Sequence, residues 1–207
     1  MATRRCTVLL SGGLDSAVAL WWARKKFRGV EALTFTFSGR SARELRAARR
    51  LAREAGVALE DVAVPFLRER GPPRGRIPAR NLVFYAIALA RAEALGAGAV
   101  VGGHTREDPA RFPDAGRPFF RKMERLAATG SRSPVRILTP LASLGKTEVV
   151  LKGLALGVPL SLTWSCYGNG PRPCGRCPAC RERREAFREC GVREPEVKSP
   201  GPVHRKR

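Results

Sequence analysis

A serine- and glycine-rich turn near the start of the chain has the residue types that bind phosphate. Ser11, Gly12, Gly13, Leu14, Asp15 and Ser16 follow an apolar run that ends at Leu10, and they precede an amphipathic segment. The glycines allow positive φ angles that turn backbone N–H groups toward an anion, the serines add hydroxyl donors, and the following helix adds its dipole. Asp15 can cap that helix or help to hold Mg2+ on a polyphosphate. We therefore expect Leu10 to Ser16 to bind the pyrophosphate part of a nucleotide, with an ordinary strand-to-helix turn as the alternative.

The chain lacks two other common phosphate motifs. No Gly-x4-Gly-Lys-Ser/Thr pattern occurs, and no Gly-x-Gly-x-x-Gly pattern follows the first apolar run. The sequence therefore argues against a P-loop kinase and against a Rossmann dehydrogenase.

A second group of chemically active residues lies near the end of the chain. Its members are Cys166, Cys174, Cys177 and Cys180. Two Cys-x-x-Cys spacings let short turns supply paired ligands, and four thiolates leave no open position on a tetrahedral ion, so we expect one structural Zn2+ ion. An iron–sulfur cluster fits the same spacing, and free or disulfide-paired thiols are a further alternative. The remaining cysteines, Cys6 and Cys190, are expected to be packing residues.

The composition predicts a folded and strongly basic protein. The 207 residues include 39 Lys and Arg against 18 Asp and Glu, for a formal net charge of +21, and 43% are hydrophobic. No run approaches the roughly 18 apolar residues of a membrane span, so we expect a soluble, cytoplasmic protein with no membrane partner. Arginine is far more frequent than lysine and glutamine is missing, a bias that predicts a thermophilic source. The charge leaves nucleic acid, nucleotide and anionic substrates all open.

Apolar, β-branched runs alternate with amphipathic segments along the chain. The expected strands are 6–10, 31–37, 58–64, 99–102 and 135–139, and the expected helices are 15–27, 42–55, 80–95, 146–156 and 181–190. This repetition predicts an α/β fold, an open parallel sheet with helices on both faces. Ligands of such sheets bind at the carboxyl ends of the strands, where the long connections 65–79 and 104–118 could act as flaps.

The composition also changes near residue 160, where glycine, proline and cysteine become frequent. We expect an α/β nucleotide-binding domain over 1–159, a small zinc-binding module over 160–190 and a tail over 191–207.

Several segments together resemble the QueC family of 7-cyano-7-deazaguanine synthases, which are N-type ATP pyrophosphatases with a pyrophosphatase (PP) loop. The matching pieces are VLLSGGLDS (8–16), ALTFTF (32–37), IPARN (77–81), FPD (112–114), TPLASLGKTEVV (139–150) and TWSCYGNGPRPCGRCPACRERREAF (163–187). The last piece is the most specific. The resemblance covers the chain from about 8 to 187 and implies an adenine nucleotide alpha-hydrolase-like fold.

The resemblance implies a ligase that uses ATP with Mg2+. ATP would adenylate the carboxylate of 7-carboxy-7-deazaguanine, ammonia would displace AMP to give an amide, and a second ATP would activate the amide so that a nitrile forms for queuosine biosynthesis. Lys146 would reach the phosphates and act with Ser11, Asp15 and Ser16, whereas a solvated lysine is the alternative. Direct tRNA binding is not required, and a homodimer is allowed.

Three further residues are implied to meet the substrate. Arg80 and Asn81 match the family's Arg-Asn pair and could contact the nucleotide or the substrate carboxylate, with helix capping and a surface arginine as the alternative. Asp114 could accept hydrogen bonds from the guanine-like edge, or be a loop-surface aspartate. The chain departs from the family pattern at Ala79, Ala115 and Gly116, so a relative that acts on another carboxylate stays open.

Two functions outside this reaction also stay open. A tRNA-modifying thiolase or lysidine-type synthetase would explain the positive charge through phosphate contacts, but a thiolase needs a reactive cysteine besides the metal ligands. A nucleic-acid-binding zinc module would explain the four cysteines and the basic tail, but it leaves the serine-glycine turn without a role.

Overall fold

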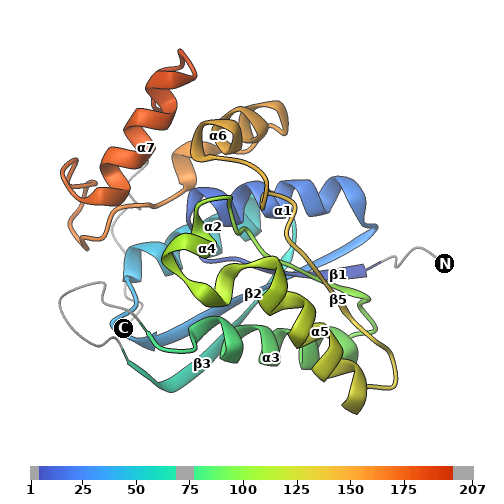
Figure 1. The fold of residues 1–207 in the computed structure, drawn as a ribbon. Helices are drawn as coiled ribbons and strands as arrows, with labels where there is room; N and C mark the ends of the chain where they lie inside the picture. The colour runs from blue at the N-terminus through green and yellow to red at the C-terminus, as the bar shows by residue number, and fades with distance from the viewer. Residues whose placement is uncertain (1–4, 69–76, 198–207) are drawn as a thin grey trace, which may run out of the picture.

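The computed structural model describes residues 5–68 and 77–197. Over this part of the chain, five parallel strands form one sheet in the order β3-β2-β1-β4-β5 (Figure 1). The strands are β1 (Arg5–Leu9), β2 (Gly29–Ser38), β3 (Ala58–Arg68), β4 (Ala99–Val101) and β5 (Arg136–Leu138). The strand order reverses beside β1, which places a topological switch point at the carboxyl end of that strand.

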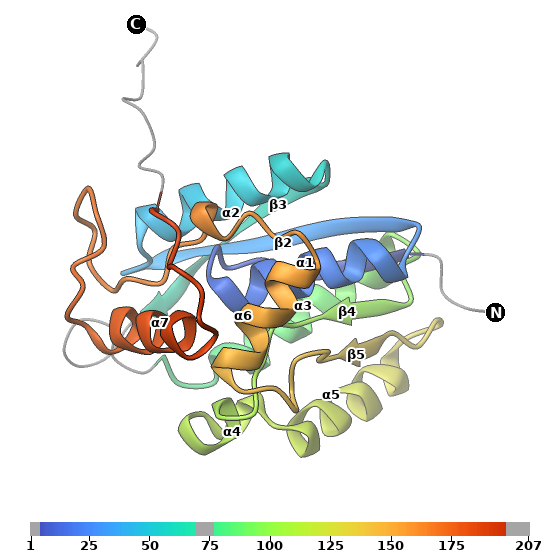
Figure 2. The same cartoon turned by 90° about the horizontal axis from the view of Figure 1, so that it is seen from above.

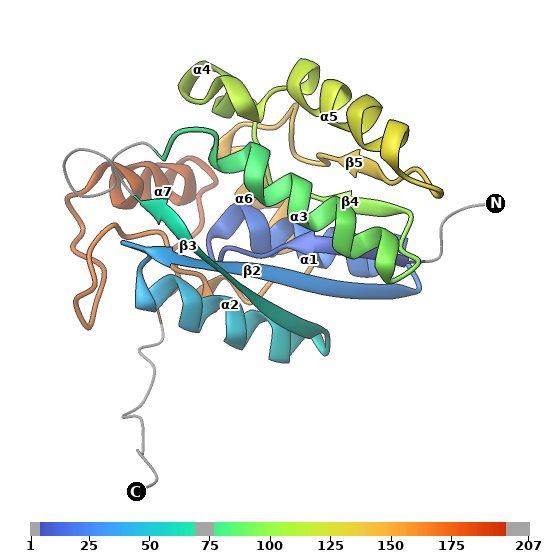
Figure 3. The ribbon, with the colours of Figure 1, turned by 90° about the horizontal axis from the view of Figure 1, so that it is seen from below.

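Helices cover both faces of the sheet, as Figures 1 and 3 show. The helices are α1 (Leu14–Lys26), α2 (Ala42–Ala55), α3 (Arg80–Ala94), α4 (Asp108–Arg111), α5 (Arg117–Gly130), α6 (Lys146–Ala155) and α7 (Pro178–Glu189), with short 3-10 turns η1 (Pro113–Ala115) and η2 (Leu160–Leu162). Helices α1, α2 and α6 lie on one face, and α3 and α5 lie on the other. The expected α/β fold with an open parallel sheet is confirmed.

Neighbouring residues of the central strands are buried on opposite faces of the sheet. Val101 is buried against α1 and α6, whereas the preceding Val100 is buried against α3 and α5, and both are fully inaccessible. Strands buried on both sides are continuously apolar, because neither face meets water. This double burial fixes the sheet and presents the strand ends rigidly at one edge.

The C-terminal segment packs against the same core. Phe187 of α7 is 1% exposed and belongs to the cluster that contains Leu20 of α1 and Val149 of α6. Figure 2 shows α7 beside α6, near the end of the molecule where α1 begins. The cysteine-rich region is thereby attached to the sheet domain through a shared apolar layer.

Some elements differ from the sequence prediction. Helices α4 and α5 occupy parts of the chain for which no helix was predicted, and α7 begins at Pro178, earlier than expected. Prolines stand at the first turns of α4, η1, α5 and α7, where their fixed φ favours helix initiation.

Much of the predicted flap over 65–79 lies outside the described residues, as does part of the tail. No helix in the described ranges combines the length and the apolarity of a membrane span.

Candidate functional site

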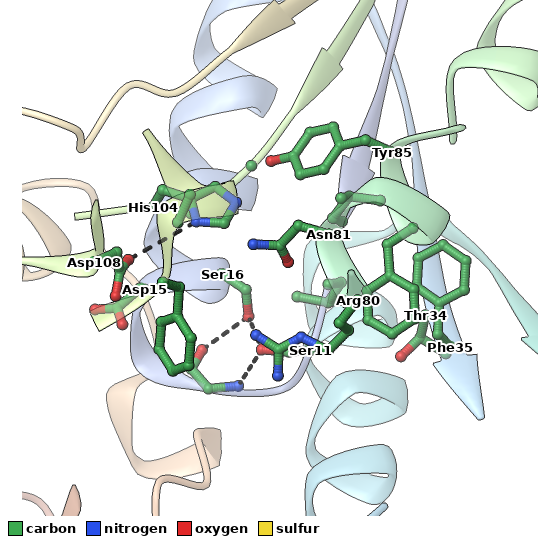
Figure 4. Close-up of a pocket in the computed structure, with 18 of the residues that line it drawn as sticks. Ser11, Asp15, Ser16, Thr34, Phe35, Arg80, Asn81, Tyr85, His104 and Asp108 are labelled. Atoms are coloured by element: carbon green, nitrogen blue, oxygen red, sulfur yellow. Dashed lines mark hydrogen bonds and ion pairs between the residues drawn. The ribbon is translucent and has the colours of Figure 1, made fainter. Parts of the chain in front are cut away.

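A cavity of about 420 Å3 opens at the carboxyl ends of β1, β2 and β4, beside the start of α3 (Figure 4). The residues around it include Ser11, Asp15, Ser16, Thr34, Phe35, Arg40, Arg80, Asn81, Tyr85, His104, Asp108 and Asp114. The serine-glycine turn over residues 11–16, called the phosphate turn below because the sequence predicts that it binds phosphate, borders one side of the cavity. The predicted substrate residues Arg80, Asn81 and Asp114 border another side. The structure therefore brings the residues predicted for these two tasks to one site.

The phosphate turn is held in shape by its own hydrogen bonds. Gly13 N donates to Ser11 Oγ over 3.3 Å, and Ser16 Oγ donates to Gly13 O over 3.1 Å and lies 3.0 Å from Ser11 Oγ. Gly12 has φ +96°, and a Cβ there would lie 2.2 Å from the backbone oxygen of Glu44. Glycine is required at position 12 for both reasons. The turn is thus a preformed cup whose donors need little rearrangement to meet an anion.

Not every residue of this segment faces the cavity. Leu10 contributes to its wall, whereas the side chain of Leu14 is 3% exposed and packs in the core. Gly12 packs against the backbone of α2. These residues shape the turn, and only its hydroxyl and backbone groups are suited to touch a phosphate.

Lys146 forms an ion pair with Asp15. Lys146 Nζ donates to both carboxylate oxygens of Asp15, over 2.7 and 2.9 Å. Burial raises the pKa of Asp15, and the lysine charge opposes that shift. Burial alone would lower the pKa of Lys146, but the carboxylate outweighs it and the pKa is raised, so the ammonium form is favoured. Lys146 lines a smaller cavity of about 190 Å3 that shares Asp15 with the larger one.

The predicted substrate residues form a hydrogen-bonded unit. Asn81 N donates to Asp114 Oδ2 over 3.2 Å, and Asn81 Nδ2 donates to the Asp114 carbonyl oxygen over 3.0 Å. The Arg80 guanidinium lies 5.8 Å from the centre of the Phe112 ring. The unit joins the first turn of α3 to η1. One carboxylate oxygen of Asp114 and its carbonyl oxygen already accept hydrogen bonds from Asn81.

Several residues in the cavity wall were not named from the sequence. His104 follows β4, and burial lowers its pKa to about 4, so its imidazole is neutral near pH 7. Arg40 follows β2 and donates to the backbone oxygens of Phe35 and Ser11, the latter over 2.9 Å. Tyr85 lies one helical turn beyond Asn81 on α3. His104 and Arg40 could have been found from the sequence, because each follows a predicted parallel strand. Residues in that position lie at the edge of the sheet where ligands bind.

The four clustered cysteines fit a metal ion. Their Sγ atoms all lie within 4.8 Å of one another. Gly168 N and Cys174 N donate to Cys166 Sγ over 3.2 and 3.3 Å. Backbone N–H groups also lower the pKa of Cys174 to about 6, which favours the thiolate that binds metal. Thiolates held this close repel one another unless a cation lies between them, so the donor set suits a tetrahedral ion.

Neither spare cysteine faces the large cavity. Cys6 lies on β1 and is 1% exposed, and burial raises its pKa to about 12. Cys190 Sγ lies 3.4 Å from the backbone oxygen of Thr147. A thiolase therefore lacks a reactive cysteine at this site among the described residues.

The cysteine cluster is connected to the phosphate turn. Trp164 N donates to the Gly12 carbonyl oxygen over 2.9 Å, and Trp164 Nε1 donates to the Cys166 carbonyl oxygen over 2.8 Å. Ser41, which caps α2, donates to Asn169 Oδ1 over 2.6 Å. The loop that carries three of the four thiols, Cys166, Cys174 and Cys177, thereby supports the turn from outside.

Solved structures show the same fold class. An NH3-dependent NAD synthetase from Campylobacter jejuni superposes with a TM-score of 0.55 at 18% identity, over 78% of this chain and 68% of that one. A 4-thiouridine synthetase in an RNA complex with bound ATP gives a TM-score of 0.54 at 23% identity, over 90% of this chain and 49% of that one. The parallel sheet with its serine-glycine turn is the PP-loop fold.

The sequence comparison defines the family within this class. The sequence model of the family "Queuosine biosynthesis protein QueC" matches residues 5–73 and 67–191 of this chain. A 7-cyano-7-deazaguanine synthase of Thermosynechococcus vestitus is 37% identical over 223 aligned residues, which cover 94% of this chain and 96% of the relative. The chain belongs to the QueC family of queuosine biosynthesis enzymes.

Proposed function

We propose that the protein is an ATP-dependent ligase that converts 7-carboxy-7-deazaguanine and ammonia into 7-cyano-7-deazaguanine. A relative that spans nearly the whole chain is named for this product, and a structure with the same fold holds ATP. The observation that carries the proposal is one cavity bordered by both a preformed phosphate turn and a polar wall suited to a small acid.

The proposed reaction has two activation steps. A carboxylate oxygen attacks the α-phosphorus of ATP and releases pyrophosphate, and ammonia then displaces AMP to leave an amide. The amide oxygen attacks a second ATP, again releasing pyrophosphate. Loss of AMP and of the nitrogen-bound protons then gives the nitrile. Each activation converts a poor leaving group into AMP, so the protein must bind and orient a polyphosphate.

The phosphate turn is proposed to bind the pyrophosphate. Backbone N–H groups and the hydroxyls of Ser11 and Ser16 would stabilise negative charge as the α–β bond breaks. Lys146 would add a positive charge, released in part from Asp15, and the Asp15 carboxylate would help to hold Mg2+ bound to the phosphates. The ion pair between them keeps both side chains beside the turn before the nucleotide arrives.

The side of the cavity formed by Arg80, Asn81 and Asp114, called the α3–η1 wall, is proposed to hold the acid. Arg80 would pair with the substrate carboxylate, and the Asp114 carboxylate would accept hydrogen bonds from the guanine-like edge. The bonds between Asn81 and Asp114 fix the aspartate in place, which supports a positioning role. Recognition and activation would then occur within one cavity.

The four thiolates are proposed to hold one Zn2+ ion with a structural role. A set of four protein ligands leaves no position for substrate, so the ion would stabilise the loop that supports the phosphate turn.

One assay tests the proposed function. Purified protein is incubated with ATP, Mg2+, an ammonium salt and 7-carboxy-7-deazaguanine, and products are followed by mass spectrometry. We expect AMP, pyrophosphate and the nitrile, with the amide as an intermediate. Omission of the acid should stop AMP formation. Turnover with a different acid, and none with this one, would contradict the proposal.

A further inference from the structure

Tyr85 has a buried hydroxyl with no hydrogen-bond partner among the described residues. The side chain is 0% exposed, and its Oη atom is one of a few buried polar atoms left unpaired there. A buried tyrosine hydroxyl normally finds a partner, because desolvation without a hydrogen bond costs free energy. A buried hydroxyl that has no partner in the ligand-free protein is suited to form a hydrogen bond with a bound ligand.

The surroundings hold this hydroxyl in one place. The Tyr85 ring centre lies 4.7 Å from that of Phe120 and 5.7 Å from that of His104. A Cβ at Gly102 would lie 1.8 Å from Tyr85 Oη, so the absence of a side chain at position 102 makes room for the hydroxyl. The ring cannot move toward solvent without losing these contacts, and the hydroxyl stays beside the end of β4.

This end of β4 lies against the phosphate turn. A Cβ at Gly103 would lie 2.8 Å from Ser16 N, so the backbone after β4 touches the start of α1. Tyr85 and His104 both contribute to the cavity, and Figure 4 shows their side chains directed toward one another above Asn81. An acid whose oxygen attacks a phosphate on the turn must lie close to this place.

We propose that Tyr85 is a substrate-binding residue whose hydroxyl donates a hydrogen bond to the carboxylate of the acid that is to be adenylated. The inference rests on the proposed function and extends it, because it names the group that orients the reacting carboxylate on the β4 side of the cavity.

The protonation states agree with this role. Burial raises the pKa of Tyr85 well above its usual range, so the phenol keeps its proton and acts as a donor. A hydrogen bond from a neutral donor to a carboxylate is among the stronger ones in proteins. The imidazole of His104, which is neutral near pH 7, places no second positive charge beside Tyr85 to compete with Arg80 for the carboxylate.

The test is the substitution Tyr85→Phe, which keeps the ring and removes only the hydroxyl. At saturating ATP, we expect KM for 7-carboxy-7-deazaguanine to rise about 10- to 100-fold, whereas KM for ATP stays within about twofold. Without ligands, the melting temperature should stay the same or rise, because an unsatisfied buried hydroxyl has been removed. A residue with a purely structural role would not separate the two KM values in this way.

Thr7→Val is the matched control. Thr7 Oγ1 is also buried and unpaired in the described structure, but it lies within β1, away from the cavity. This variant should also keep or raise the melting temperature, with both KM values unchanged. If the wild type turns over the acid and Tyr85→Phe keeps its KM, the assignment of Tyr85 is overturned. A clear loss of melting temperature in Tyr85→Phe would overturn it too, whereas no turnover by the wild type would overturn the proposed function and this assignment together.

Discussion

The phosphate turn and the α3–η1 wall border the same cavity but are built in different ways. The turn is one continuous segment whose hydrogen bonds join residues up to five positions apart. The wall is assembled from distant segments, since its bonds join Asn81 to Asp114, 33 positions away. In the proposed function, the backbone and hydroxyl donors that meet the phosphates of ATP therefore come from one short segment, whereas recognition of the particular acid depends on how α3 meets η1.

The strongest test of this difference is Ser16→Ala in the turn. The substitution removes a hydroxyl that donates to Gly13 O and could stabilise the departing pyrophosphate. We expect kcat for AMP formation to fall by about 100-fold or more, whereas the melting temperature should fall by only a few degrees for the lost hydrogen bonds. Ser133→Ala, at an exposed position outside the site, should change neither quantity. Near-normal turnover in Ser16→Ala would refute the assignment of the turn.

The second prediction concerns the external support of the turn. Cys177→Ser should remove the bound metal and lower the free energy of unfolding by about 3 kcal/mol or more, or roughly 10 °C in melting temperature. Elemental analysis of the wild type should find one zinc per chain, and iron in its place would indicate an iron–sulfur cluster. Cys190→Ser is the control, because Cys190 lies outside the cluster and should keep the metal. Loss of turnover with unchanged melting would make the metal site catalytic.

The third prediction tests the neutral histidine on the β4 side of the cavity. The pKa of His104 is about 4 in the folded protein, against 6.5 as its ordinary value. Between these values the unfolded chain binds a proton that the folded chain does not, so stability falls as pH decreases from about 6.5 to 4. We expect this difference in proton binding to lower the free energy of unfolding by up to about 3 kcal/mol over that pH range. A His104→Gln variant, measured by chemical denaturation, should lack this pH dependence. If the free energy of unfolding depends on pH in the same way in both proteins, His104 has its ordinary pKa and the prediction is wrong.

The smallest expected effect lies at the start of the wall. Ala79 precedes α3 with φ +53°, the one left-handed non-glycine residue in the described structure. Ala79→Gly should relieve this strain and raise the free energy of unfolding by about 0.5 to 1 kcal/mol. Ala90→Gly, at an exposed position inside the same helix, should lower it by about 1 kcal/mol. Equal destabilisation of both variants in urea denaturation would argue against strain at position 79.

The sequence predicted the parts of the molecule that depend on neighbouring residues. The serine-glycine turn, the alternation of strands and helices, and the cysteine spacing all follow from local patterns, and the structure shows the turn, the parallel sheet and four close thiols. Asn81 and Asp114 were named through a resemblance, but their mutual hydrogen bonds could not be inferred, since nothing local links them.

Other features escaped prediction for physical reasons. Only Phe120 and Met123 of helix α5 are buried, so few of its residues carry the apolar pattern by which a helix is predicted. Tyr85 lies on a regular helix among apolar residues, and such a pattern predicts that a tyrosine packs in the hydrophobic core. Its relation to the cavity depends on the small size of Gly102, a contact between α3 and the end of β4 that sequence periodicity does not express.

The hydrogen bond from Trp164 to Gly12 has a practical consequence. If the four thiolates hold a zinc ion as proposed, a chelator that removes the ion would disturb the phosphate turn without touching a serine or a phosphate. The activity lost in this way would be restored by adding zinc back and not by adding more nucleotide.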